Sequence, residues 1–392
     1  MAEFQPRPTI LIFSTAYFPM IGGAELAIKE ITDRLSADFD FVLFTARLKR
    51  SLSKHERIGP VEIRRLGFGV IPFLDKLFSP FAGAYFAHKL IKKNKIALFW
   101  SVMATYTSGA PFILKVFGLN KDVPILLTLQ EGDSESHLKF SNLGLTGLSW
   151  MMAVRLADKI QVISRFLRDF SIRMGASAEK IVIVPNGADL NIFNKDVAPE
   201  ELRELKIRHG ITDKQKVVIT ASRLVRKNAV DILIKAVAEI PDAHFFIAGI
   251  GPEEKKLKEL ASFLKLEKRT HFMGAMSHDA LSKYYAMAHV FARPSRSEGL
   301  GSAFLEAMGA GLPIIGTNVG GIPDFLKHNE TGLFCEVDDP RDLAIKIKRF
   351  LHDPDFRKKI GQNGKKLVYE NYSWDKIAVT IGGIFYRLTR AQ

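Results

Sequence analysis

The stretch that decides the fold reads Pro294-Ser295-Arg296-Ser297-Glu298-Gly299-Leu300-Gly301-Ser302-Ala303-Phe304-Leu305-Glu306-Ala307-Met308. It follows an apolar run typical of a buried strand, and it predicts a glycine loop and then a helix beginning near Ser302. Glu298 is expected in the loop and Glu306 about one turn inside the helix. Backbone amides at a helix N-terminus bind phosphate, and carboxylates accept hydrogen bonds from hydroxyl groups. Two incidental acids would leave the glycines unexplained, so we interpret the stretch as an anion site flanked by hydroxyl-binding acids.

Short apolar runs alternate with helical patterns on both sides of this stretch. The runs that predict strands are Thr9–Ser14, Phe41–Thr45, Ile96–Trp100, Pro124–Gln130, Lys159–Ser164, Ile181–Pro185, Val217–Ala221, His244–Ala248, His271–Met273, Val290–Pro294, Pro313–Thr317 and Leu333–Val337. Helical patterns lie between them, for example Ala24–Leu35 and Asp231–Ala238. This alternation predicts right-handed βαβ units around parallel sheets, in two Rossmann-like series.

The length of 392 residues suits two domains. The polar segment 191–199 predicts the joint, which gives a first domain over 1–196 and a second over 197–372. The apolar residues of 372–388 recur at helical spacing, but this period alone does not say where the helix packs.

Composition excludes several classes of protein. The chain is 47% hydrophobic and 25% charged, as in an ordinary folded protein. Its single cysteine, Cys335, excludes a disulfide framework and a cysteine-built metal site. The uncharged stretch Ile96–Leu114 is too polar to span a membrane, and the polar start at Met1–Pro8 does not predict a signal peptide. We therefore expect a cytoplasmic protein, free or peripheral on a membrane.

The charge balance is strongly basic, with 56 Lys and Arg against 42 Asp and Glu. The excess lies in the first half: Arg47–Arg65 is rich in cations, and Lys76–Lys121 contains no acidic residue. Such a balance predicts an anionic partner, whether phosphate, nucleic acid or a membrane face.

Three other strand ends carry candidate phosphate contacts. Gly22 and Gly23 open the first helix, and Arg223 and Lys227 follow the strand that ends at Ala221. Gly249 follows the next strand. Ligands of open α/β sheets sit beyond the carboxyl ends of the strands. Taken alone, each feature also fits a plain turn or a solvated basic loop.

Together these motifs resemble the GT-B fold retaining glycosyltransferases of family 4, also called glycosyltransferase group 1. The resemblance covers essentially the full chain, and its most specific part runs from Glu298 to Glu306. It continues through Gly311-Leu312-Pro313, Gly320-Gly321-Ile322-Pro323 and Asn329-Glu330-Thr331-Gly332. Pro185-Asn186-Gly187-Ala188-Asp189 also matches in order and spacing. The family fold has two Rossmann-like domains whose parallel sheets face an inter-domain cleft, with a C-terminal helix, here 373–392, packed back on the first domain.

The resemblance also implies a role for each matching residue of the donor site. Arg223 and Lys227 would neutralise the donor diphosphate, helped by the amides of Gly22 and Gly23. Glu306 would hold the ribose of the donor. Glu298 would hold hydroxyls of the transferred sugar beside the amides of Gly299, Leu300 and Gly301, and Gly249 completes the predicted donor-binding set. No metal and no cofactor are expected besides a UDP- or GDP-linked sugar.

Two positions depart from the family pattern, and the milder change is Asn228 after Lys227, where the family usually has glycine. Gln130 follows the strand 125–129 where the family usually has a histidine, and a glutamine can bind a hydroxyl but cannot carry a proton. His137 could substitute only if its loop folds back. The departure matters little in a retaining reaction in which the acceptor hydroxyl attacks the face that the nucleotide leaves. In that reaction the diphosphate takes the proton. We therefore count Gln130, with Glu298, Arg223 and Lys227, among the predicted catalytic residues.

The acceptor side is less defined by the sequence. The aromatic and basic segment 73–95 predicts either a helix that meets an anionic membrane or one that packs on the sheet. Membrane contact would imply a lipid-linked acceptor or a cell-surface glycan precursor, whereas no nucleic-acid binding module is visible. The leading expectation is transfer of a hexose to a glycan or lipid-linked acceptor. The alternatives are a sugar-nucleotide epimerase of the same fold and a non-catalytic protein that binds membranes or polyanions.

Overall fold

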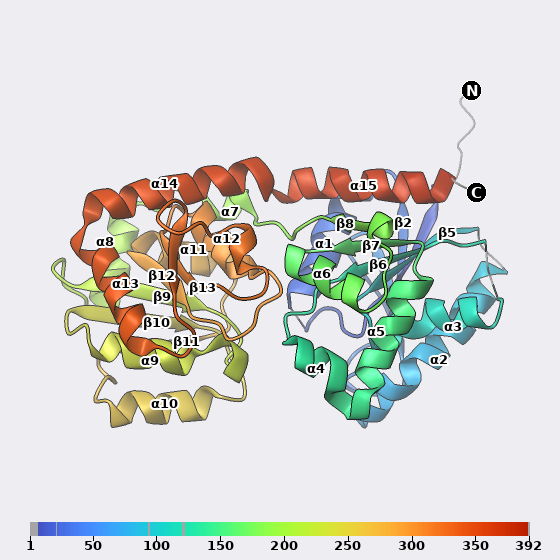
Figure 1. Ribbon diagram of the computed structural model, residues 1–392, viewed down its shortest axis with the longest axis horizontal. Coiled ribbons are helices and arrows are strands. Elements are labelled where there is room, and N and C mark those ends of the chain that lie inside the picture. The colour runs from blue at the N-terminus through green and yellow to red at the C-terminus, as the bar shows by residue number, and fades with distance from the viewer. Residues whose placement is uncertain (1–6, 21, 93–94, 120–121, 391–392) are drawn as a thin grey trace. The chain divides into compact units, whose positions relative to one another are not determined.

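The structure is a computed structural model that describes residues 7–20, 22–92, 95–119 and 122–390 (Figure 1). The chain splits into two compact units: Met1–Asn186 with Trp374–Gln392, and Gly187–Ser373. The first boundary thus lies at Asn186 and not at residue 196. The reason is that the short helix α7 (Leu190–Phe193) packs within the second unit, where the ring of Phe193 lies 5.7 Å from that of Tyr285.

In the first unit, the described strands form an eight-stranded sheet in the order β3-β4-β2-β1-β5-β6-β7-β8. Their bounds are β1 Thr9–Phe13, β2 Asp40–Ala46, β3 His55–Ile58, β4 Val61–Leu66, β5 Ile96–Val102, β6 Ile125–Leu129, β7 Lys159–Val162 and β8 Ile181–Ile183. Neighbouring strands are parallel except β3, which pairs antiparallel with β4 at the sheet edge. The predicted strands are confirmed and differ only at their ends.

The sequence patterns did not predict β3 and β4, because their residues lie inside the basic run. Val61 and Ile63 of β4 are buried, whereas Glu62 between them is exposed. Arg65 occupies the next buried position of this alternation, where its fully buried side chain forms an ion pair with Glu56 at 2.5 Å. A cation that is neutralised by an ion pair therefore takes a core-facing position of β4. For this reason the strand lacks the continuous apolar run that would predict it.

The helices of the first unit are α1 Gly23–Leu35, α2 Pro72–Ile91, α3 Ala110–Val116, α4 Glu135–Phe140, α5 Leu145–Leu156, α6 Arg165–Arg173 and α15 Trp374–Arg390, with 3-10 turns Tyr106–Gly109, Ser141–Gly144 and Ala178–Lys180. Helix α15 packs beside α1. Its side chains Trp374, Ile381 and Phe385 join one buried cluster with β1, β2, β4 and β5. The C-terminal helix is therefore part of the first unit's core.

In the second unit, the described strands form a six-stranded parallel sheet in the order β11-β10-β9-β12-β13-β14. Their bounds are β9 Lys216–Ala221, β10 Ala243–Ala248, β11 Thr270–Gly274, β12 Val290–Arg293, β13 Ile314–Thr317 and β14 Gly332–Cys335. The central pairs β10–β9, β9–β12 and β12–β13 are all parallel. The carboxyl ends of these strands therefore meet at one edge, where the sequence predicted the donor site.

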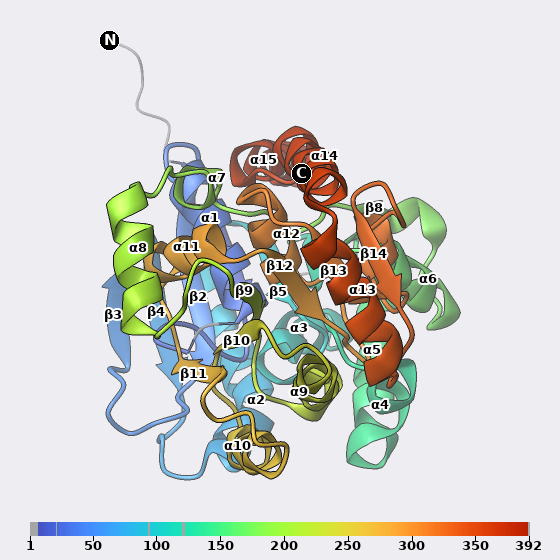
Figure 2. The same ribbon diagram turned by 90° about the vertical axis from the view of Figure 1, so that its left-hand side faces the viewer.

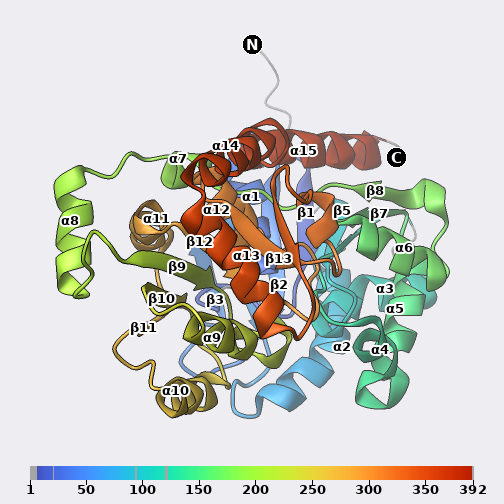
Figure 3. The same ribbon diagram turned by 60° about the vertical axis from the view of Figure 1, so that its left-hand side comes forward.

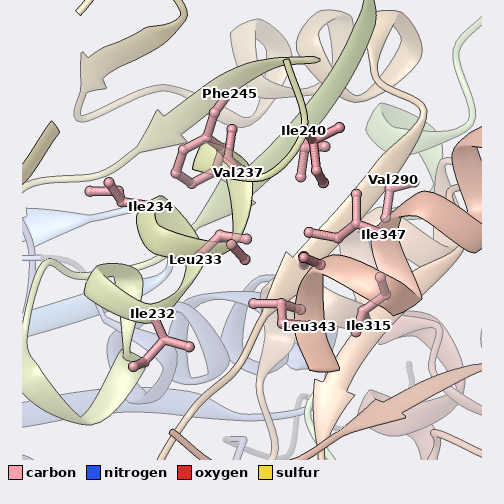
Figure 4. Packing of buried hydrophobic residues seen from close by; sticks show 14 of the residues in the cluster. Ile232, Leu233, Ile234, Val237, Ile240, Phe245, Val290, Ile315, Leu343 and Ile347 are labelled. Carbon is pink, nitrogen blue, oxygen red and sulfur yellow. The ribbon is translucent and has the colours of Figure 1, made fainter. Parts of the chain in front are cut away.

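The remaining helices are α8 Pro199–Arg208, α9 Val230–Ala238, α10 Glu254–Phe263, α11 His278–Met287, α12 Ser302–Gly309, α13 Pro340–His352 and α14 Pro354–Asn371, with 3-10 turns Arg226–Asn228 and Ile322–Asp324. Helices α9 and α13 pack together (Figure 3), and their apolar residues meet those of the strands in one cluster (Figure 4). Helix α12 lies beside α14 (Figures 1 and 2). This packing fixes α12, and with it the loop that precedes it.

Candidate functional site

The loop between β12 and α12 is held in a conformation that requires glycine. Gly301 precedes the first residue of α12 and has a φ of 94°. A Cβ there would also lie 2.8 Å from the Phe304 ring and 3.3 Å from Glu298. The predicted placement is confirmed, because Glu298 lies in the loop and Glu306 lies in the helix. The loop and the helix together bring both carboxylates to the end of β12.

A buried arginine that the motifs did not single out holds Glu298. Arg293 ends β12, is 6% exposed and forms an ion pair with the Glu298 carboxylate. Its guanidinium lies 4.9 Å from the centre of the Phe304 ring and donates to the Ala221 carbonyl at 3.3 Å. Burial lowers the pKa of Arg293 to about 10, so the side chain stays charged at neutral pH. Arg293 therefore fixes the position and charge of Glu298.

The glycine pair that follows β13 packs on the backbone of Glu298. Gly320 has a φ of 54°, and a Cβ there would overlap the Glu298 carbonyl oxygen. That oxygen accepts a hydrogen bond from the N–H of Gly321 at 3.2 Å. Glycine is needed at position 320 because the two loops touch backbone to backbone there.

Glu306 is the second acid of the site, and it is 7% exposed. Its carboxylate lies 3.8 Å from Nε2 of His278, at the start of α11. Burial raises the pKa of Glu306, while His278 and Arg293 lower it. A nearly buried carboxylate beside an imidazole is suited to accept hydrogen bonds from a ligand's hydroxyl groups.

The predicted basic residues lie at the end of β9, the strand beside β12. Arg223 is exposed and Lys227 is half-buried. The side chain of Asn228 donates to the Arg223 carbonyl at 2.7 Å, so asparagine closes this turn where the family usually has glycine. Arg296 joins the two loops: its N–H donates to the Lys227 carbonyl at 2.7 Å. Its guanidinium grips Asp231 through two bonds of 2.9 and 3.0 Å.

Gly249 has a structural explanation of its own. A Cβ there would overlap the Ser222 carbonyl, and its N–H donates to the Gly274 carbonyl at 2.7 Å. The missing side chain lets the β10 loop touch the loop that carries Arg223. A contact between Gly249 and a donor stays a prediction.

The first unit holds the other predicted residues at its own sheet edge. Gly22 precedes α1, and a Cβ there would lie 2.7 Å from the Glu25 carboxylate, which bends back to the helix start. Negative charge thus lies at the amides that were predicted to receive a phosphate. Gly23 faces Asn186: a Cβ added at position 23 would lie 3.8 Å from the side-chain nitrogen of Asn186.

Gln130 lies at the centre of a buried polar cluster. Its side-chain oxygen accepts a hydrogen bond from Asn186 at 2.9 Å. The next residue, Glu131, is 3% exposed and accepts from the N–H groups of Ala104 and Gln130 at 2.8 and 2.9 Å. Burial raises the pKa of Glu131 to about 7. His137 does not join the cluster, because it is exposed on α4.

The structure therefore gathers two sets of residues, one in each unit. Glu298, Glu306 and the β9 loop share the second unit's edge, and Gly23 and Gln130 share the first unit's. Sequence analysis missed Arg293, Arg296, His278 and Glu131 as site residues. A charged residue ending an otherwise apolar strand, as Arg293 does, was the available signal. The sequence carries no such signal for His278, because this residue lies on another helix, α11, and approaches Glu306 only in the folded structure.

The comparisons define the class of protein first. Over 99% of this chain and 100% of the other, the fold matches sucrose-phosphate synthase from Thermosynechococcus elongatus with a TM-score of 0.85 at 22% identity. The structure of HepE from Anabaena in complex with UDP and glucose matches with a TM-score of 0.79 at 22% identity, over 97% of this chain and 100% of the other. The fold is thus that of a GT-B protein.

The sequence comparisons then give the family. The profile described as glycosyl transferases group 1 matches residues 202–367, and that of glycosyltransferase family 4 matches 21–192. The chain belongs to this group 1, family 4 class of glycosyltransferases. N-acetyl-alpha-D-glucosaminyl L-malate synthase of Bacillus anthracis is 29% identical over 240 residues, 60% of this chain and 61% of that one. A glycosyltransferase of Methanocaldococcus jannaschii is 34% identical over 203 residues, 51% of this chain and 52% of the other. The chain thus spans between half and two thirds of these relatives' lengths.

Proposed function

We propose that this protein transfers a hexose from a nucleotide-diphosphate sugar to an acceptor hydroxyl with retention of the anomeric configuration. The observation that carries the proposal is the carboxylate pair of the second unit. Glu306 is nearly buried beside His278, and Glu298 is fixed by Arg293. Each carboxylate can accept hydrogen bonds from one half of a sugar nucleotide, ribose at Glu306 and hexose at Glu298.

The diphosphate would lie between these acids, at the exposed Arg223 and at Lys227. Transfer then requires stabilisation of the negative charge that grows on the leaving diphosphate. The cations at this strand end can supply it without a metal ion. Metal independence and the choice between UDP and GDP belong to this proposal. The solved relative HepE holds UDP and glucose, whereas a mannosyltransferase of Mycobacterium tuberculosis, 31% identical over 57% of this chain and 60% of that one, is GDP-mannose-dependent.

A retaining reaction also fits the residue that replaces the family histidine. Gln130 is held by Asn186 at 2.9 Å and offers an amide, which cannot take a proton. We propose that it binds a hydroxyl of the transferred sugar, and that the acceptor proton goes to the departing diphosphate. The protein then contributes position and electrostatics rather than a general base.

The exposed aromatic side chains of helix α2 favour an acceptor that lies at a membrane. Phe73, Phe81 and Tyr85 are 61%, 62% and 54% exposed, and Lys89 lies 4.4 Å over the Tyr85 ring. Within the described residues, no helix is long and apolar enough to cross a bilayer. We propose that this face dips aromatic side chains into the cytoplasmic surface of an anionic membrane. The acceptor would then be lipid-linked, in the synthesis of a glycan.

Donor binding tests the proposal directly. The purified protein is scanned by thermal shift with UDP- and GDP-linked hexoses and N-acetylhexosamines, beside Glu306→Ala and the exposed control Glu330→Ala. A donor at 100 times its dissociation constant stabilises the fold by about 2.7 kcal/mol. We expect one donor to stabilise the wild type and the control but not Glu306→Ala. If no donor shifts any of the three proteins, the proposal is wrong.

The two alternatives differ from transfer in their products. An epimerase would convert the donor without an acceptor, and NMR of the donor alone would show a new sugar. A non-catalytic binding protein would consume no donor with any acceptor. NMR of the transferred product also gives the anomeric configuration, and activity in excess EDTA tests metal independence.

A further inference from the structure

Helix α2 contacts its own unit through small side chains and leaves its large ones outside. Its buried residues are Asp75, Ser79, Gly83, Ala84, Ala87 and Leu90. A Cβ at Gly83 would lie only 3.0 Å from that of Ala110, so the backbone of α2 closely approaches α3. Figures 1 and 3 show the two helices side by side. Because the two helix backbones lie so close together, there is no room between them for the aromatic side chains of α2, which lie exposed instead.

Most of the remaining apolar residues form two rows along α2, each with a spacing of four, and all members of these rows except Ala82 are large. The inner row is Leu74, Phe78, Ala82 and Phe86, and the outer row is Phe73, Leu77, Phe81 and Tyr85. The inner row lines a cavity of about 700 Å³, whereas the outer row does not. Phe44, Leu66 and Phe68 form the facing wall, from β2, β4 and the loop after β4. A volume of this size is typical of a site for one small organic ligand.

The same cavity has a basic edge. Lys54, His55, Arg64 and Arg65 line it: Lys54 directly precedes β3, His55 begins β3, and both arginines belong to β4. Arg65 is buried and paired with Glu56. Arg64 is paired with Glu62 at 2.7 Å, but Lys54 is exposed and has no ion pair within the described part of the chain. Asp75 is the acidic residue of the lining, and the N–H groups of Phe68 and Gly69 occupy its carboxylate at 2.7 and 2.9 Å. The charge that a ligand meets at the exposed edge of the cavity is therefore the positive one of Lys54, because the Asp75 carboxylate is buried and already hydrogen-bonded.

We propose that this cavity binds one hydrocarbon chain of a phosphate-bearing amphiphile, with the phosphate at Lys54. A chain of methylene groups needs no hydrogen bonds, which suits walls of Phe and Leu. A peptide segment would bring backbone groups that these walls could not satisfy. A flat membrane surface would need only the outer row and would not require a cavity behind it.

The inference rests on the proposed function, because it assigns the cavity to the lipid part of the acceptor. It separates two tasks on one helix. The outer row meets the membrane, while the inner row withdraws a single chain from it and so holds the attached sugar close to the first unit.

The test is calorimetric titration of the full-length protein with dodecyl phosphate below its micelle-forming concentration. Phe78→Asp and Phe81→Asp form a matched pair, because these phenylalanines are 61% and 62% exposed on the same helix. We expect saturable one-to-one binding that Phe78→Asp weakens about tenfold or more, since a charge enters an apolar wall. Phe81→Asp should retain this binding but reduce flotation with anionic vesicles.

Lys54→Gln tests the place of the phosphate. It should weaken dodecyl phosphate about threefold to tenfold and leave dodecyl maltoside unchanged, because only the first ligand is charged. Equal losses in Phe78→Asp and Phe81→Asp, or no saturable binding by the wild type, would overturn the proposal. Donor binding at Glu306 is measured without amphiphile, so failure of the cavity and failure of the transferase proposal give different results.

Discussion

Replacement of Arg293 by methionine should destabilise the second unit and disable donor binding through one contact. Methionine can fill much of the buried space beside Phe304, but it removes the partner of Glu298. The Glu298 side chain is only 14% exposed, so its charge would remain poorly hydrated. Arg293 itself is charged at neutral pH, because its pKa is about 10. The substitution therefore leaves an unpaired, largely buried carboxylate.

Breaking a buried ion pair from one side costs about 3–5 kcal/mol. For a unit of this size, 1 kcal/mol corresponds to about 2–4 °C in Tm, so the Tm of the second unit should fall by roughly 6–20 °C. In the double variant Arg293→Met/Glu298→Gln the uncompensated charge is gone. Most of the lost stability should therefore return, whereas donor affinity should not.

Differential scanning calorimetry measures stability in the four proteins of this cycle, with Glu298→Gln as the fourth. Titration with the donor found by the thermal-shift panel measures affinity. A single variant Arg293→Met whose stability stays within about 1 kcal/mol of the wild type would refute the argument. So would a double variant that recovers both stability and donor affinity, because Glu298 would then have no role in binding.

Three further outcomes follow from glycine geometry and from buried titratable groups. Gly320→Ala should abolish measurable donor binding and lower the Tm, because the new Cβ would overlap the Glu298 carbonyl oxygen. The matched control is Gly210→Ala, since Gly210 also has a positive φ, 64°, but has open space around its Cβ. This control should keep donor binding. Glu131 has a pKa raised from 4.5 to about 7, so its contribution to the free energy of unfolding is complete below pH 4.5 and declines as pH rises through 7, by on the order of 3 kcal/mol. Urea unfolding at several pH values checks this, and Glu131→Gln should remove that dependence. His289 accepts a hydrogen bond from the Val217 N–H at 3.1 Å, and burial lowers its pKa from 6.5 to about 4. Its contribution is therefore complete above pH 6.5 and is lost as pH falls through 4, and an acid titration of the second unit that shows equal loss in wild type and His289→Gln would contradict it.

Much of the fold could be predicted because parallel strands buried on both faces are continuous apolar runs. The runs 9–14, 217–221 and 290–294 all became strands of the two sheets. Strand β4 could not be found this way, because its buried Arg65 is neutralised by Glu56 from the neighbouring strand β3. Such a pairing depends on register and not on composition.

The candidate site was predictable where a motif is local in sequence. Glu298 and Glu306 belong to one loop and helix, and their spacing identified both. Arg293 reads as an odd residue in an apolar strand until its ion pair is seen. His278 and Asn186 come from distant segments, and only the packing of α11 and β8 brings them to the site residues. A side chain whose role depends on contact with a residue from a distant segment leaves no pattern in a single sequence by which that role could be predicted.

The return of α15 has a consequence for the order in which the units are completed during synthesis. Trp374, Ile377, Ile381, Ile384 and Phe385 complete the buried cluster around β1 and β5, yet the ribosome makes them after all of Gly187–Ser373. The second unit is continuous and can close as soon as it emerges, whereas the first must wait with part of its apolar surface uncovered. The segment made first is therefore finished last, and chaperones have their longest opportunity to bind the strands β1, β2 and β5.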